Sequence, residues 1–120
     1  MIQLHIIDDF LLQNKLSSFK QKKWWQENYP DELYKKDYII ALLIHSFSWC
    51  FCVMLVPFII GWQLGTLSWL HYLIFTVNTA VHAIVDDLKA NKLKLNLTQD
   101  QLIHLIQIII IWLMLIVYKI

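Results

Sequence analysis

Three long stretches of the chain carry no Asp, Glu, Lys or Arg, and they limit the possible folds more than any other feature. They are residues 38–60, 67–85 and 102–118. Each is close to the roughly 20 residues that an α-helix needs to cross about 30 Å of hydrocarbon. Hydrophobic residues make up 58% of the chain and charged residues only 16%, whereas soluble domains average roughly 45–50% and 25%. The sequence therefore predicts an integral membrane protein.

The segment before these runs, residues 2–19, is less hydrophobic but keeps the spacing of a helix. Leu4 and Leu11 belong to its apolar side, whereas His5 and Asp9 are four residues apart and share a different side. A helix with such a polar stripe needs other helices to shelter the stripe from lipid. We therefore expect a fourth transmembrane helix here.

The linker 20–37 mixes lysines and acidic residues with tryptophans and tyrosines. Beside a membrane this mixture is typical of an interfacial belt, so no nucleic-acid partner is expected. Pro30 divides the linker, which predicts a short amphipathic helix before it and a turn after it. Thr98 and Gln101 have the spacing of a capping box at the start of the last helix. The predicted fold is a single all-α membrane domain, residues 1–120, in which four transmembrane helices at about 2–19, 38–60, 66–88 and 99–118 form an up-and-down bundle.

The distribution of charge orients this bundle. All ten basic residues are lysines, of which six lie in residues 15–36 and three in residues 89–94. Cytoplasmic loops of membrane proteins carry an excess of lysine and arginine, so both stretches are predicted to be cytoplasmic. The N-terminus and the short link 61–66 then lie outside. The predicted location is the inner (cytoplasmic) membrane, with multiple passes through the lipid bilayer.

Polar residues of the four predicted helices fall in one layer of this bundle. His45, His82 and His104 each lie roughly 9–10 Å from the cytoplasmic end of their helix, and Asp9 and His5 lie roughly 9 and 15 Å from theirs, at about 1.5 Å per residue. Ionisable side chains inside a membrane are costly, and they mark functional sites more often than elsewhere. The layer is therefore a candidate site in the cytoplasmic half of the membrane.

Six of the polar residues form pairs spaced four residues apart, so both members of a pair share one helix face. Imidazole and carboxylate together are a common ligand set for zinc, manganese or iron. The same pairs could instead be hydrogen bonds that hold membrane helices together, or a proton relay in which aspartate orients histidine. The pairs are His5 with Asp9, His82 with Asp86, and Asp100 with His104.

Four stretches of the sequence together resemble a family of small bacterial and phage membrane proteins, domain of unknown function family 3307. They are HIIDDFLLQNK (5–15), the HS at 45–46, VHAIVDDLKA (81–90) and DQLIHLI (100–106), and the resemblance covers nearly the whole chain. The family pattern selects Asp9 rather than Asp8 and Asp86 rather than Asp87. The residues that match it are His5, Asp9, Phe10, Leu12, Gln13, His45, His82, Asp86, Lys89, Asp100, Gln101 and His104.

The resulting functional prediction is a membrane-embedded, metal-dependent hydrolase acting on a lipid-linked or phosphorylated substrate from the cytoplasmic leaflet. The alternative is a non-enzymatic membrane scaffold, phage–host modulator or proton or ion path, in which the His/Asp pairs are structural. Either protein could assemble as a homo-oligomer. The predicted ligands of a divalent metal ion (zinc, manganese or iron) are His5, Asp9, His82, Asp86 and His104; Asp100 and His45 are the predicted catalytic or supporting groups, and Gln13, Lys89 and Gln101 the predicted substrate-binding groups.

Overall fold

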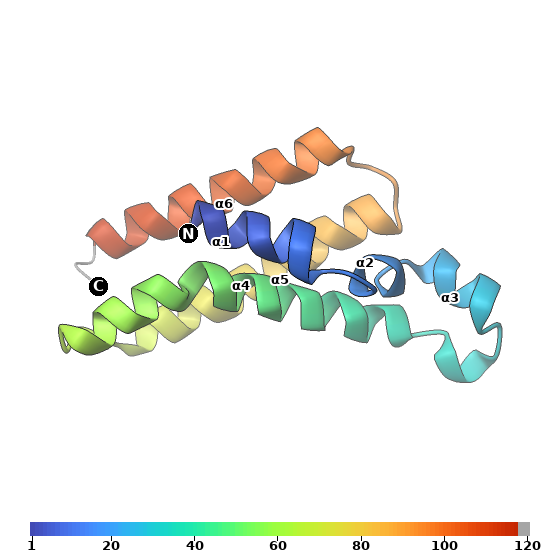
Figure 1. Ribbon diagram of the computed structural model, residues 1–120, viewed down its shortest axis with the longest axis horizontal. Coiled ribbons are helices and arrows are strands. Elements are labelled where there is room, and N and C mark those ends of the chain that lie inside the picture. Colours follow the sequence, from blue (N-terminus) through green and yellow to red (C-terminus); the bar gives the residue numbers. More distant parts are fainter. Residues whose placement is uncertain (118–120) are drawn as a thin grey trace.

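The computed structural model describes residues 1–117, and all regular structure in that range is helical (Figure 1). This confirms the all-α prediction for these residues; the predicted end of the last helix at 118 lies outside them. In chain order the elements are α1 (Ile2–Ile6), the π-helix η1 (Ile7–Leu12), α2 (Leu16–Phe19), α3 (Lys22–Asn28), the 3₁₀ helix η2 (Glu32–Tyr34), α4 (Asp37–Gln63), α5 (Trp69–Ala90) and α6 (Leu97–Val117).

Three long helices build the frame, and the short first segment lies inside it. α4 and α5 form an antiparallel hairpin, and α6 packs mainly against α5. The first segment, α1 and η1, lies between α4 and α6 (Figure 1). The apolar core fills the end of the bundle away from residues 89–94. Its buried members are Trp49, Cys50, Val53, Met54, Ile74, Ile108, Ile111 and Leu115.

The first segment differs from the predicted continuous helix 2–19. Helical structure stops after Leu12, and Asn14 adopts the left-handed conformation with φ of 35°. Asparagine is one of the few non-glycine residues that tolerate this conformation. Residues 2–12 therefore span roughly 17 Å at about 1.5 Å per residue, well short of the roughly 30 Å of a bilayer core. The predicted position of the N-terminus outside depends on a full first crossing, which this segment does not provide.

Two of the predicted transmembrane segments are long and apolar enough to cross a membrane. They are residues Glu32–Gln63, which contain η2 and α4, and α6. α5 has 22 residues, but His71, Asn78, His82 and Asp86 lower its hydropathy. The predicted bundle of four crossing helices is therefore not confirmed; its two most apolar members are candidate membrane spans by length and composition.

The start of α6 differs from the prediction. The helix begins at Leu97, and the reciprocal cap is made by Asn96 and Gln99, not by Thr98 and Gln101. Asn96 Oδ1 accepts a hydrogen bond from the backbone N–H of Gln99 at 2.9 Å, and Gln99 Oε1 accepts one from the backbone N–H of Asn96 at 3.0 Å. The prediction was wrong because asparagine caps a helix as well as threonine does, and here it comes two residues earlier. The side chain of Gln101 is consequently free to face the interior.

The linker follows the prediction made from Pro30. α3 ends before this proline and η2 forms after it. The aromatic side chains of the linker pack on one another, with ring centroids 5.1 Å apart for Trp24 and Trp25 and 5.3 Å for Tyr29 and Tyr34. The linker is therefore an ordered aromatic cap at the end of the bundle that carries residues 89–94.

Candidate metal centre

A buried cluster of histidines and aspartates lies where the first segment meets α4, α5 and α6. The first segment contributes three members, α4 one, α5 two and α6 two. All are almost completely shielded from solvent, with at most 6% of any side chain exposed. The members of this His/Asp cluster are His5, Asp8, Asp9, His45, His82, Asp86, Asp100 and His104.

The π-helix η1 brings two consecutive aspartates to the same histidine. Asp9 Oδ1 lies 3.3 Å from His45 Nε2, and Asp8 Oδ2 lies 3.7 Å from Nδ1 of the same ring. Neighbouring residues on an ordinary α-helix point about 100° apart, and π-helical turns are frequent at functional sites. The sequence favoured Asp9 over Asp8, but in the structure both reach His45.

Asp86 is the central carboxylate of the cluster. Its Oδ2 lies 3.3 Å from His45 Nε2, and its Oδ1 lies 3.4 Å from His104 Nε2 and 3.8 Å from His82 Nε2. The next residue, Asp87, points away and pairs with Lys92 near the surface. The structure thus places Asp86, and not Asp87, among the histidines.

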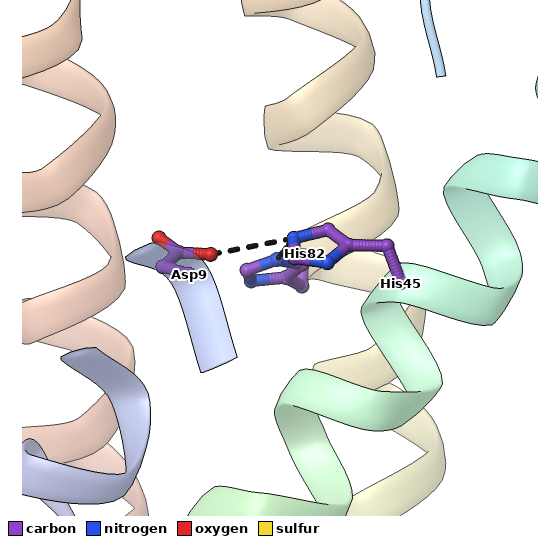
Figure 2. A group of neighbouring side chains, drawn as sticks. All are labelled: Asp9, His45 and His82. Atoms are coloured by element: carbon purple, nitrogen blue, oxygen red, sulfur yellow. Dashed lines mark hydrogen bonds and ion pairs between the residues drawn. The ribbon is translucent and has the colours of Figure 1, made fainter. Parts of the chain in front are cut away.

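Figure 2 shows how Asp9, His45 and His82 converge from three separate segments. His45 Nε2 and His82 Nε2 are 3.3 Å apart. The His82 ring stacks on Trp49 and on His104, with centroid distances of 4.3 and 4.1 Å. Two imidazole nitrogens this close can coexist only with a proton or a cation between or beside them.

Two overlapping sets of three side chains have the spacing of metal ligands. Asp9, His45 and His82 form one set, and His82, Asp86 and His104 form the other; within each set the ligand atoms lie within 4.8 Å of one another. Each set contains two imidazoles and one carboxylate, which suits zinc or iron sites with further open positions. Four of the five predicted metal ligands therefore meet.

His104 is oriented so that its Nε2 faces the cluster. Its Nδ1 lies 3.1 Å from Gln107 Oε1, and the Gln107 amide nitrogen lies 3.4 Å from Asn78 Oδ1. An amide oxygen only accepts hydrogen bonds, so Nδ1 carries a proton, and Nε2 is the nitrogen that faces the carboxylates. Such a second hydrogen bond is how metal-binding histidines are usually held.

Two buried polar atoms face each other without a hydrogen bond between them. His104 Nε2 and Asp100 Oδ1 are 3.3 Å apart, and within residues 1–117 neither has a hydrogen-bond partner. The exposed fraction is 0% for His104 and 1% for Asp100. A buried polar atom without a hydrogen-bond partner destabilises the folded protein. A proton shared by these two atoms, or a cation beside them, would satisfy both.

His5, a predicted metal ligand, has both ring nitrogens occupied. The indole N–H of Trp49 donates to His5 Nδ1 at 2.6 Å, so Nε2 carries the proton and donates to Gln101 Oε1 at 3.2 Å. The Gln101 amide nitrogen then donates to Asp9 Oδ2 at 2.9 Å and to Asp100 Oδ2 at 3.2 Å. The structure therefore corrects the role of His5: it orients Gln101, which in turn holds two carboxylates, and it has no free lone pair for a metal.

The predicted substrate-binding residues separate into two groups. Gln13 and Lys89 line a cleft of about 370 Å³ that ends at Asp86, whereas Gln101 lies inside the cluster. Lys89 Nζ lies 2.6 Å from Asp100 Oδ2. The cleft is lined by Gln13, Ser17, Lys20, Gln21, Asp86, Lys89, Ala90 and Leu93.

Lys20 is the main residue that sequence reasoning missed. Its side chain is 9% exposed and its Nζ lies 2.5 Å from Asp86 Oδ2. Nothing in the sequence distinguishes it from the other lysines nearby. Trp49 was also missed, although its position four residues after His45 places both on one face of α4.

The charges of the cluster do not balance. Four carboxylates, those of Asp8, Asp9, Asp86 and Asp100, face two ammonium groups, those of Lys20 and Lys89. With neutral imidazoles, two negative charges remain in a buried place, where an uncompensated charge is costly. Either two further protons or one divalent cation would neutralise them.

Comparison of the chain with protein-family models, with curated proteins and with solved structures finds no match. The resemblance to domain of unknown function family 3307 stays a prediction.

Proposed function

We propose that this protein is a membrane-embedded, metal-dependent hydrolase for a lipid-linked or phosphorylated substrate. The observation that carries the proposal is a pair of buried polar atoms without a hydrogen-bond partner within residues 1–117, His104 Nε2 and Asp100 Oδ1, beside Asp86. A divalent cation held by His82, Asp86 and His104 would satisfy His104 Nε2 and supply the two missing positive charges. Zinc, manganese and iron all accept this ligand set.

A bound divalent ion would make its water a nucleophile at neutral pH and would polarise a phosphoryl oxygen. Asp100 Oδ1 would accept the proton of that water, because its other oxygen is already engaged by Lys89 and Gln101. In the hydrolysis of a phosphate monoester, the water oxygen forms the new bond to phosphorus, the ester bond breaks, and the proton passes to the leaving alcohol.

The cleft ending at Asp86 is suited to the anionic part of such a substrate. Its volume of about 370 Å³ is in the usual range of small-molecule sites, roughly 300–1,000 Å³. Lys20 and Lys89 line it together with the amide of Gln13. Ammonium and amide N–H groups are the donors that a phosphate requires.

The surface supports a location in the lipid bilayer. Large apolar side chains are exposed along α4 and α6, such as Phe47 at 56% and Ile109 at 53%. Soluble monomers rarely expose apolar patches of this extent. In this proposal the lysine-rich stretches are cytoplasmic, and residues 2–12 enter the membrane only partway, with Phe10 and Leu11 facing lipid.

The test is metal analysis of the purified protein after incubation with zinc, manganese or iron and removal of free ion, followed by hydrolysis assays on a soluble phosphate monoester and a phosphorylated lipid. We expect at least one ion per chain and metal-dependent release of phosphate. His104→Gln should abolish both, whereas Asp87→Asn, which changes an aspartate outside the cluster, should change neither. Absence of bound metal would refute the proposal; metal without hydrolysis would favour a non-enzymatic scaffold or ion path.

A further inference from the structure

Asp86 presents its two carboxylate oxygens to two different sets of side chains. Oδ1 faces His104 and His82, which are the ligands proposed above. Oδ2 faces away from them, toward His45 at 3.3 Å. A carboxylate used in this way is typical of sites where it bridges two metal ions, which lie about 3.5–4 Å apart in known enzymes.

The side of Oδ2 has the composition of a second ligand set. His45 Nε2 lies 3.3 Å from both Asp9 Oδ1 and Asp86 Oδ2. One proton on this nitrogen can satisfy only one of these carboxylates. Asp9 and His45 have the spacing of metal ligands together with His82, and Asp86 Oδ2 lies beside this set at His45 Nε2.

Asp8 faces the other ring nitrogen of His45. Its Oδ2 lies 3.7 Å from His45 Nδ1, and its Oδ1 accepts a hydrogen bond from Ser48 Oγ at 2.6 Å. Asp8 is 1% exposed, and within the described residues its Oδ2 has no hydrogen-bond partner. A carboxylate placed behind a histidine is the usual way to direct the other ring nitrogen toward a metal.

A positive charge already occupies this side of the cluster. The ammonium group of Lys20 lies 2.5 Å from Asp86 Oδ2. The side chain reaches this position from the linker, along the cleft, on a flexible four-carbon stem. A shift of this stem within the cleft would carry the ammonium away from Asp86.

We infer that Asp9, His45 and the Oδ2 of Asp86 form a second divalent-cation site, and that an ion bound there displaces the ammonium of Lys20 into the cleft. This inference rests on the proposed function, because Asp86 bridges the second ion to the first. Two divalent ions balance the four carboxylates of the cluster. Lys20 and Lys89 then carry two excess positive charges, which a phosphate dianion in the cleft would neutralise, so the substrate class is a phosphate monoester.

The test is a titration of the metal-free protein with Mn²⁺ in detergent, read by bound metal per chain and by electron paramagnetic resonance. We expect two ions per chain and the signal of a spin-coupled pair, which one isolated ion does not produce. Lys20→Met should raise the affinity for the second ion at least tenfold, because the competing ammonium is gone. Lys92→Met, which removes a lysine paired with Asp87 outside the cluster, should leave both affinities unchanged.

The outcomes separate the inference from the proposed function. One ion per chain with an uncoupled signal, in the wild type and in Lys20→Met, overturns the second site and leaves the hydrolase proposal standing. No bound ion overturns both. Two ions whose affinities do not change in Lys20→Met overturn the displacement of Lys20. The wild-type stoichiometry and spectrum decide whether the second site exists even if the variant fails to fold.

Discussion

Replacement of Lys20 by methionine tests its buried ion pair with Asp86. Methionine keeps much of the length and apolar character of the lysine stem but removes the ammonium, so the Asp86 carboxylate loses the partner at 2.5 Å. Only 9% of the Lys20 side chain and 2% of the Asp86 side chain are exposed, so solvent screens this pair little. Removal of one partner of such a buried pair costs about 3–5 kcal/mol. Because folded proteins are stable by only about 5–15 kcal/mol, this is a large fraction of the total.

The assay is reversible unfolding in mixed detergent micelles, without divalent ions. The free energy of unfolding should fall by about 3–5 kcal/mol in Lys20→Met. Lys92→Met is the matched control, since Lys92 pairs with the neighbouring Asp87 at 3.2 Å but is 55% exposed; solvent screening limits its effect to about 0–1 kcal/mol. Saturating Mn²⁺ should restore much of the loss in Lys20→Met. Equal effects of the two substitutions in metal-free buffer would show that burial of the Lys20–Asp86 pair does not matter.

Three further substitutions test the supports of the cluster and the start of α6. Gln107→Leu removes the acceptor of the His104 Nδ1 proton, so metal affinity should fall about 10–100-fold; unchanged affinity in a metal titration would contradict this role. Trp49→Phe keeps an aromatic ring on His82 but leaves the buried Nδ1 of His5 without its donor. The free energy of unfolding should fall by about 1–3 kcal/mol. A much smaller loss would contradict the role of this hydrogen bond. Asn96→Ala should destabilise the protein by about 1 kcal/mol in the same unfolding assay, whereas Thr98→Ala should have little effect. A larger loss in Thr98→Ala than in Asn96→Ala would favour Thr98 as the capping residue, as predicted from the sequence.

Most of the cluster was predictable because its members repeat at helical spacing. His82 with Asp86 and Asp100 with His104 are four residues apart, and a single helix suffices to place such pairs on one face. Depth from the lysine-rich stretches then assigned them to one layer. Neither argument needs knowledge of how the helices pack.

The errors lie where the position of a side chain depends on a second segment. His5 has the same spacing from Asp9 as the other pairs, but the indole of Trp49 takes its lone pair. The first helix was predicted to be continuous over residues 2–19, whereas the chain turns at Asn14. That turn carries Lys20 back to Asp86.

Spacing along the chain was sufficient for the helical class, for the two long apolar helices, and for the polar faces of α5 and α6, because hydrophobic period and charge are local properties. Packing between segments was needed to determine which nitrogen of each histidine is free, which carboxylates share His45, and which lysine neutralises Asp86. Those properties depend on distances of 2.5–3.7 Å between groups far apart in sequence, and such distances exist only once the helices have packed.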